Sequence, residues 1–359
     1  MEGVAPHQPF SSQKTRINVL SYGIQTWTDL SSVLSGITHV TDRQTEVSSL
    51  YRVCITRSAV KIINDLHCVF AATGVIKIST DNWILGVTLV DDELFVLLFP
   101  RYDNQVCVYS INDYQQRRHL NVPRYEPDDS SDMTSCVRHK CLYMSDLDNS
   151  CIHRYQLAST LTDKIKRVVR SARYELASSA TSKWSVPGNP RGLSVTPRGN
   201  LLVTCWEPNK LVELSVDSGK CVREIALQSD IECPRHSVQL TTGQFVVCHL
   251  HRVCVVGDDG KVTRSYGGQR GSDVGQLDRP CHLAVDEDSQ FIFVADHWNH
   301  RVVLLSPTLE FVRYIEGLSD PRGLYFHQAT RRLFVGQYYV MQQQAGGDWR
   351  HGDVRVIQL

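Results

Sequence analysis

The segment Asp296-His297-Trp298-Asn299-His300 crowds potentially reactive side chains between two strand-like runs. Its carboxylate and imidazoles are groups that transfer protons and bind metals, and Trp298 adds a large apolar face. Further histidines, His236 and His282, recur at equivalent places in two neighbouring stretches, and His249 follows another strand-like run. Three imidazoles and a water would suit a catalytic zinc ion, so the elements that position them decide whether such a site exists.

A repeat of 41 to 46 residues carries these side chains. Pro190, Pro234, Pro280 and Pro321 each open a unit in which a short strand, a turn and further β-rich runs follow in the same order. Four strands in each 40–50 residues is the pattern of propeller blades.

Six units are present when two weaker copies, Trp83–Val122 and Asp132–Leu157, are included. The last unit ends at Leu359 after its third strand, and the β-rich segment Ala59–Ile78 precedes the first unit. An open sheet edge invites unwanted pairing, which closing the ring removes. The sequence therefore predicts an all-β, six-bladed β-propeller of four-stranded blades, in which Ala59–Ile78 supplies the missing strand.

The expected organisation is a propeller over residues 59–359, with its closing strand at about 59–78 and its six units at about 83–359. Residues 1–58 are rich in Ser, Thr and Gln, fit no unit, and are expected to form an N-terminal tail. Residues 160–180 interrupt the second unit, and the helical spacing of their apolar side chains predicts an inserted short helix or loop.

Composition restricts the partners. The 38 basic and 38 acidic residues cancel, which argues against bulk nucleic acid or an anionic membrane as partner. No run of 18 apolar residues is present, and the first residues lack a secretory signal, so a cytoplasmic, monomeric protein is expected. None of the twelve cysteines forms a C-x-x-C pair. They are expected to be core thiols, with no metal or cofactor bound.

The stretch "PCHLAVDEDSQFIFVADHWNHRVVLLSP", residues 280–307, resembles the NHL repeat, whose pattern includes an opening Pro, a Val-Ala-Asp and an Asn-x-Arg-Val. The resemblance covers about residues 80–359 and implies a six-bladed propeller. NHL domains occur in tripartite-motif ubiquitin ligases, where they bind RNA or proteins, and also form the lyase that completes peptide amidation. The cysteine spacing of a RING is absent, so no ligase activity of this chain's own is expected.

The lyase branch of NHL proteins places its metal-binding histidines directly after the proline of a unit. The residues at that place here are Arg191, Arg235, Cys281 and Arg322. His236 and His282 stand one residue later, so strand alternation predicts that they point to the opposite side of their strands. We therefore expect no metal ligands and no catalytic residues, and expect both imidazoles to be hydrogen-bonded in the core or between blades.

Symmetry predicts that Arg191, Arg235 and Arg322 gather around the central channel. Guanidinium groups stay charged, so they need anionic partners. Two arrangements remain open: internal pairing with carboxylates such as Asp296 or Glu207, or an external acidic peptide, carboxylate or phosphate.

The residues that follow the second strand of each unit are expected to face one end of the ring. In chain order they are Phe99, Asp146, Trp206, His249, Asp296 and Gln337. Exposed aromatic and imidazole groups at such loops are typical of binding surfaces.

The sequence thus predicts a non-enzymatic adaptor that binds a protein or peptide through residues at one end of the propeller. These residues are Arg191, Arg235, Arg322, Trp206, His249, Asp296, His297 and Trp298. Two alternatives stay open. One is binding of single-stranded RNA, or a ubiquitin-pathway role, as in tripartite-motif NHL proteins. The other is a metal-dependent lyase or hydrolase on a propeller.

Overall fold

A computed structural model describes residues 75–80, 82–99, 105–157, 181–342 and 348–359. The described part is all-β, apart from two single 3-10 turns, η2 (His297–Asn299) and η3 (Gln328–Thr330). The N-terminal tail, residues 59–74 and the inserted segment 160–180 lie outside the described residues.

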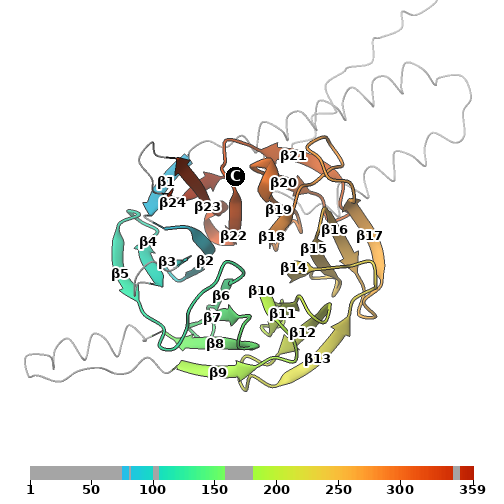
Figure 1. Cartoon of the computed structure of the whole chain (residues 1–359), viewed down its shortest axis with the longest axis horizontal. Helices are drawn as coiled ribbons and strands as arrows, with labels where there is room; N and C mark the ends of the chain where they lie inside the picture. The colour runs from blue at the N-terminus through green and yellow to red at the C-terminus, as the bar shows by residue number, and fades with distance from the viewer. Residues whose placement is uncertain (1–74, 81, 100–104, 158–180, 343–347) are drawn as a thin grey trace, which may run out of the picture. The chain divides into compact units, whose positions relative to one another are not determined.

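Six four-stranded antiparallel sheets stand side by side around a common axis, as predicted (Figure 1). The first three blades comprise β2 (Ile84–Val90), β3 (Glu93–Leu98), β4 (Val106–Ser110) and β5 (Gln116–Leu120); β6 (Met133–Cys136), β7 (Cys141–Asp146), β8 (Cys151–Gln156) and β9 (Thr181–Ser185); and β10 (Pro190–Val195), β11 (Leu201–Cys205), β12 (Lys210–Leu214) and β13 (Cys221–Ala226). The last three comprise β14 (Pro234–Gln239), β15 (Phe245–His249), β16 (Arg252–Val256) and β17 (Val262–Gly267); β18 (Pro280–Val285), β19 (Ile292–Asp296), β20 (Arg301–Leu305) and β21 (Phe311–Ile315); and β22 (Pro321–His327), β23 (Arg332–Gln342), β24 (Asp348–Gln358) and β1 (Val75–Thr80).

The N-terminal strand closes the ring, as predicted. β1 pairs with β24 in antiparallel register, with Val75 opposite Ile357 and Thr80 opposite Gly352. It forms the outermost strand of the sixth blade, whose other three strands come from the end of the chain. The sixth sheet is thus completed by a segment distant in sequence, and the ring has no gap between its last and first blades.

The core lies between blades rather than inside one layer. Six clusters of buried side chains fill the six interfaces, including the one between the last blade and the first. The second strand of a blade is therefore buried on both faces: every residue of Leu201–Cys205 and of Phe245–His249 is buried. This explains the continuous apolar runs in the sequence, because a strand that is covered on both faces does not need polar residues at alternate positions.

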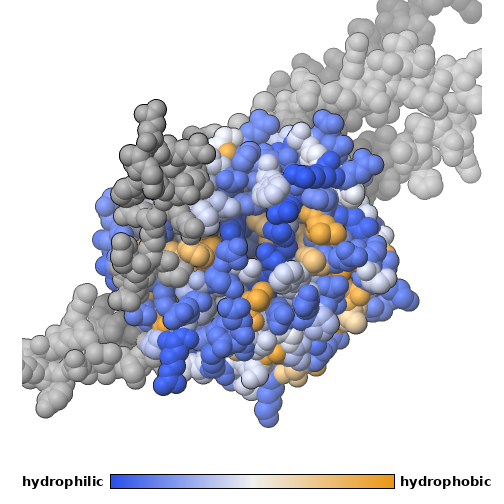
Figure 2. All heavy atoms as spheres, in the orientation of Figure 1, coloured by the Kyte–Doolittle hydropathy of each residue, from blue (hydrophilic) through white to orange (hydrophobic). Residues whose placement is uncertain are grey.

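The outermost strands are partly exposed, and they carry charged and polar residues, as in Gln116–Leu120. Figure 2 agrees with this arrangement: the face turned to the viewer is mostly hydrophilic, and its hydrophobic residues form small, separated spots. The broad apolar surfaces of the sheets are thus used up in the interfaces between blades.

Candidate functional site

The arginines that follow the unit prolines occupy β-bulges at the start of the innermost strands. In β10 the cross-strand pairing passes from Pro190 to Gly192, so Arg191 is an extra residue without a partner in β11. The same irregularity falls at Arg235 in β14 and at Arg322 in β22. A bulge re-aims the side chain of its extra residue, so simple alternation does not apply there.

Gly192 shows how closely the innermost strands approach at this point. A Cβ atom added to it would lie 2.4 Å from the carbonyl oxygen of Arg235 in the next blade. Only glycine fits such an approach without movement of the backbone. The two arginine-bearing bulges are thereby held side by side.

All six blades contribute to one pocket of about 250 Å³ on the axis of the ring, which we call the axial pocket. Its charged and polar lining comprises Arg191, Arg235, Arg279 and Arg322, together with Asp129, Ser130, Ser131, Asp132, Cys281, His282, His297, Trp298 and Tyr338. The three bulge arginines thus face a common cavity, with a fourth arginine beside them.

The bulge arginines form no ion pair with any carboxylate in the described part of the chain. Internal pairing with Asp296, one of the two arrangements open from the sequence, is therefore wrong: Asp296 pairs with Arg301, whose Nε lies 2.8 Å from its carboxylate. Pairing with Glu207, which is exposed, does not occur either. Burial, and then the charges of Arg235 and Arg322, lower the pKa of Arg191 to about 10. The pocket therefore holds uncompensated positive charge.

Trp298 stands at the rim of the axial pocket with 42% of its surface exposed. The guanidinium of Arg279 lies 3.9 Å from the centroid of its ring, and that of Arg270 lies 5.3 Å away. Arginine stacked on an indole face gains a cation–π attraction and holds the ring in place. The rim thus combines a fixed aromatic face with positive charge.

His297 is buried beside Trp298 and forms hydrogen bonds to the sixth blade. Its Nδ1 lies 3.2 Å from the carbonyl oxygen of Pro321, so Nδ1 carries the proton and donates. Its Nε2 then accepts from the hydroxyl of Tyr338 at 3.2 Å. Burial, and then the charge of Arg322, lower the pKa of His297 to about 4. This imidazole is therefore neutral and positions Tyr338 against the pocket.

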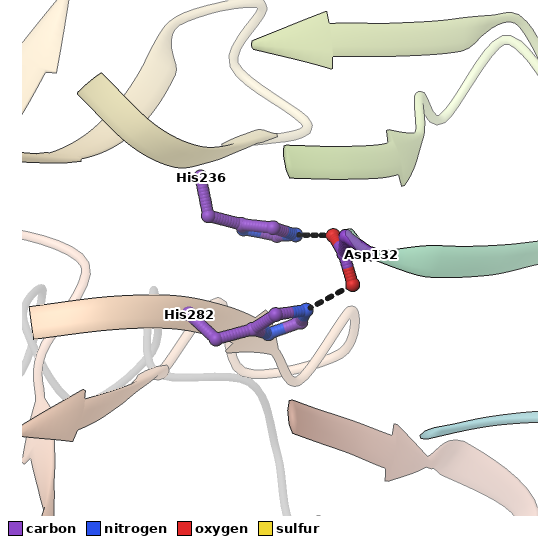
Figure 3. Close-up of side chains that lie close together, drawn as sticks. All are labelled: Asp132, His236 and His282. Atoms are coloured by element: carbon purple, nitrogen blue, oxygen red, sulfur yellow. Dashed lines mark ion pairs between the residues drawn. The ribbon is translucent and has the colours of Figure 1, made fainter. Parts of the chain in front are cut away.

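Asp132, His236 and His282 form a buried cluster at the axis (Figure 3). The two imidazole rings stack with centroids 3.8 Å apart. Nε2 of His282 lies 3.3 Å from one carboxylate oxygen of Asp132, and Nε2 of His236 lies 3.6 Å from the other. The same oxygens accept hydrogen bonds from the backbone N–H groups of Met133 and Leu193. One carboxylate therefore connects four blades, the second to the fifth.

From strand alternation, His282 was expected to point to the opposite side of its strand from Cys281, the residue after the proline. This expectation is wrong. His282 and Cys281 both line the axial pocket. The reason is the bulge between Pro280 and His282, which removes one step of alternation. The expectation that both imidazoles are hydrogen-bonded between blades agrees with their contacts to Leu193 and Leu324 of neighbouring blades.

The ligand atoms of this cluster lie within 4.8 Å of one another, which is close enough to hold a metal ion. The hydrogen bonds argue against that use. Nε2 of His236 faces the carbonyl oxygen of Leu193 at 3.0 Å and must donate to it. Nδ1 of His282 accepts from the N–H of Leu324, which leaves the proton on its Nε2, beside Asp132. A metal needs a free lone pair where these nitrogens carry hydrogen.

His249 does not join the other two histidines in that cluster. It is buried, and its Nε2 lies 3.4 Å from the sulfur of Cys254. Burial, and then the charge of Arg252, lower the pKa of His249 to about 4. The set of three imidazoles considered from the sequence is therefore replaced by two imidazoles and Asp132.

Of the residues expected to follow the second strand of each unit, Phe99 and Trp206 do so. The others lie within their strands: Asp146, His249 and Asp296 are the last residues of β7, β15 and β19, and Gln337 lies inside β23. Cys205, not Trp206, lies opposite Pro190, as His249 lies opposite Pro234. Likewise β3 ends at Leu98, one residue before Phe99. Trp206 nevertheless lies near the arginines, because its ring centroid is 5.5 Å from the guanidinium carbon of Arg191.

Asp296 is fully buried at the end of β19. Its oxygens accept from the N–H of Asp278, from the amide of Asn299 and from Arg301. Burial raises the pKa of Asp296 more than these donors lower it. Its contacts hold the turn that carries His297 and Trp298, so it acts on the rim through that turn.

Sequence reasoning did not select Asp132, Arg279 or Tyr338. Each lies in a different blade and meets the others only once the ring is closed. Asp132 is buried and precedes the first strand of the weak second unit. It is distant in sequence from the two histidines that it contacts, so no local pattern points to it. Arg279 precedes a unit proline and adopts a positive φ of 52°, which no composition rule anticipates.

Within the described residues, no helix is long and apolar enough to cross a membrane. No protein-family model matches the chain, and no curated protein matches it. Solved structures do match. A streptogramin B lyase has a TM-score of 0.51 at 10% identity, over 80% of this chain and 87% of that one. A catalytically inactive virginiamycin B lyase from Staphylococcus aureus, with quinupristin, has a TM-score of 0.52 at 9% identity, over 80% and 99%.

At such low identity these likenesses establish the fold alone. The chain is a six-bladed β-propeller whose axial pocket is lined by arginines. Neither lyase activity nor membership of the NHL family follows from the comparison.

Proposed function

We propose that the propeller is a non-enzymatic recognition platform, an adaptor that binds a protein or peptide through the loops around the axial pocket. One observation carries the proposal: Arg191, Arg235 and Arg322 face one pocket without a carboxylate partner among the described residues. Guanidinium groups cannot shed their charge, so such a pocket favours an anionic ligand. Exposed Trp298 supplies the kind of anchor that dominates many interfaces.

The resemblance of the units to NHL repeats supports this proposal, because NHL domains bind proteins or RNA. Membership of that family is part of the proposal, as are the expected cytoplasmic location and monomeric state. Both can be checked by microscopy of the tagged chain and by light scattering.

The chemistry of the pocket lining supports a role without catalysis. Burial raises the pKa of the Cys281 thiol to about 11, although the neighbouring arginines act in the opposite direction. A thiol with a raised pKa is a weak nucleophile at neutral pH. Both nitrogens of His297 are already engaged with Pro321 and Tyr338. A metal ion held by Asp132, His236 and His282 would require both imidazoles to give up their hydrogen bonds.

RNA is the second candidate partner, and one observation favours it. The stacked pair of Arg279 and Trp298 resembles the combination of aromatic and basic groups on which RNA bases stack. The chain has equal numbers of basic and acidic residues, and this zero net charge argues against RNA as the partner. RNA binding would weaken steeply with salt, because each neutralised phosphate releases counterions.

Affinity capture from the native cell, followed by cross-linking, tests the proposal. The wild-type chain should capture a protein whose cross-links map to the axial pocket. Arg322→Gln and Trp298→Ala should lose it, whereas Arg198→Gln should retain it, because Arg198 is exposed in the turn at the opposite end of β10. Loss of capture after ribonuclease treatment would transfer the proposal to RNA. Stoichiometric zinc or calcium in the purified protein would contradict a role without catalysis.

A further inference from the structure

The axial pocket has an excess of positive charge that suits a doubly charged anion. Four arginines line it, and the carboxylates in its lining are Asp129 and Asp132, so the arginines and carboxylates leave a formal charge of +2. Asp132 is already engaged by two imidazoles and two backbone N–H groups. Asp129 is exposed, and the hydroxyl of Ser130 donates to it.

The direction of the donors distinguishes a phosphoryl group from a carboxylate. Arg191, Arg235 and Arg322 come from the third, fourth and sixth blades, so their guanidinium groups approach the axis from three sides. A carboxylate offers two oxygens in one plane. A phosphomonoester offers three terminal oxygens in a tetrahedral arrangement and carries about −1.5 to −2 charges at pH 7. Three guanidinium groups on separate blades match the geometry and charge of a phosphomonoester.

The size of the pocket indicates how much of a ligand enters it. Its 250 Å³ is below the range of about 300–1,000 Å³ typical of pockets that enclose drug-sized molecules. The end of one side chain fits, and a larger ligand would extend out of the pocket. The rest of the ligand must then lie on the rim, where Trp298 is exposed and fixed by Arg279.

We infer that the axial pocket binds the phosphoryl group of a phosphorylated side chain on a partner protein, while the flanking partner residues contact Trp298. This inference rests on the proposed recognition function and names the group that is recognised. It requires no bond to be made or broken. The bulges of β10, β14 and β22 place three charged donors in the lining of one pocket.

The test begins with a degenerate peptide library that contains phosphoserine or phosphothreonine, passed over the immobilised full chain. Enriched sequences are synthesised in phosphorylated, unphosphorylated and glutamate-substituted forms. We expect the phosphorylated form to bind at least about tenfold more tightly than either other form, because it alone offers a dianion to the three arginines. Phenyl phosphate should compete for the pocket, and acetate at equal ionic strength should not.

Variants locate the binding. Arg235→Gln and Arg322→Gln should each weaken binding of the phosphorylated peptide by at least about tenfold. Arg198→Gln keeps the same change of charge at the opposite end of the ring and should bind as the wild type does. Thermal melts check that each variant is folded, so a loss of binding by a folded Arg322→Gln chain is attributable to the pocket.

Several results would overturn the inference. Equal affinity for the glutamate form would make this a carboxylate site, and single-stranded RNA that binds where no phosphopeptide does would make it a nucleic-acid site. Absence of any enriched phosphopeptide would also overturn it. If a captured protein binds through the pocket equally well after phosphatase treatment, this inference fails while the recognition function stands. If the arginine variants change no binding of any kind, both fail.

Discussion

The imidazole rings of His236 and His282 stack 3.8 Å apart beside one buried carboxylate, that of Asp132. Burial alone would raise the pKa of Asp132, yet the two histidines and the N–H of Leu193 outweigh burial and hold it below its usual value. The three side chains come from the second, fourth and fifth blades. A contact across the axis therefore supplements the contacts between adjacent blades.

Removing this carboxylate should destabilise the ring. Asp132→Ala leaves the N–H groups of Met133 and Leu193 without their acceptor, and it removes the carboxylate that lies beside two buried imidazoles. The free energy of unfolding, measured in urea, should fall by about 3–5 kcal/mol, as when one partner of a buried pair is removed. Asp148→Ala is the control, because Asp148 is exposed; its effect should stay within about 0.5 kcal/mol. Equal effects of the two variants would contradict the bridging role of Asp132.

Stability should fall as the solution is acidified below pH 6.5. His236 has a pKa of about 3 in the folded chain, against an ordinary value of 6.5, because burial and the nearby His282 oppose its charge. His249 and His297 are lowered to about 4 in the same way. The unfolded chain therefore takes up protons first, so their contribution is fully present above pH 6.5 and is lost as the pH falls toward these folded values.

Urea unfolding at pH 7 and pH 5 measures this effect. Each of these histidines contributes a slope of up to about 1.4 kcal/mol per pH unit in that window. His236→Gln should flatten the dependence, whereas His300→Gln should not, because His300 is exposed. A wild-type stability that is the same at both pH values would show that these imidazoles are not held neutral.

The arginines divide into structural and unpaired ones, and thermal melts should separate them. Arg301 is 6% exposed and bonded to fully buried Asp296, so Arg301→Ala should cost about 3–5 kcal/mol. Arg191→Ala and Arg322→Ala remove charges that repel one another and have no carboxylate partner. Their melting temperatures should stay near the wild-type value or rise. A large loss in Arg322→Ala would indicate an internal partner and remove this residue from the proposed site.

The closing strand should contribute to stability through one face only. Ile78 is 5% exposed and belongs to the core between the last and first blades, whereas Ile76 of the same strand is 40% exposed. Ile78→Ala should lower the free energy of unfolding by about 2–5 kcal/mol, the range for emptying a buried aliphatic site. Ile76→Ala makes the same chemical change on the open face and should cost much less. Similar losses in both would show that β1 is not docked by Ile78.

The sequence was sufficient to predict the number of blades and the closure of the ring, because prolines and apolar runs recur at nearly constant spacing. It placed the closing segment at Ala59–Ile78, and the described strand is Val75–Thr80. Strand ends were less predictable. Trp206 follows its strand, as expected, whereas His249 and Asp296 are the last residues of β15 and β19 rather than the residues after them.

The site was predictable only in part. Repeat symmetry brought Arg191, Arg235 and Arg322 to attention, since equivalent positions in a propeller face the same axis. The bulges that let His282 share a pocket with Cys281 leave no mark in composition. The contact of Asp132 with two histidines from other blades depends on tertiary closure, which a local pattern does not contain.

The antiparallel pairing of β1 with β24 has a mechanical consequence. Val75 lies opposite Ile357, so the N-terminal end of β1 and the C-terminal end of β24 lie at the same end of the sheet. Tension applied through both flanks would load the backbone hydrogen bonds one after another, as in peeling, rather than all together, as in shear. The sixth blade would then be the first to unfold under tension. It would open at low force and release the ring, while the other five blades would still be intact.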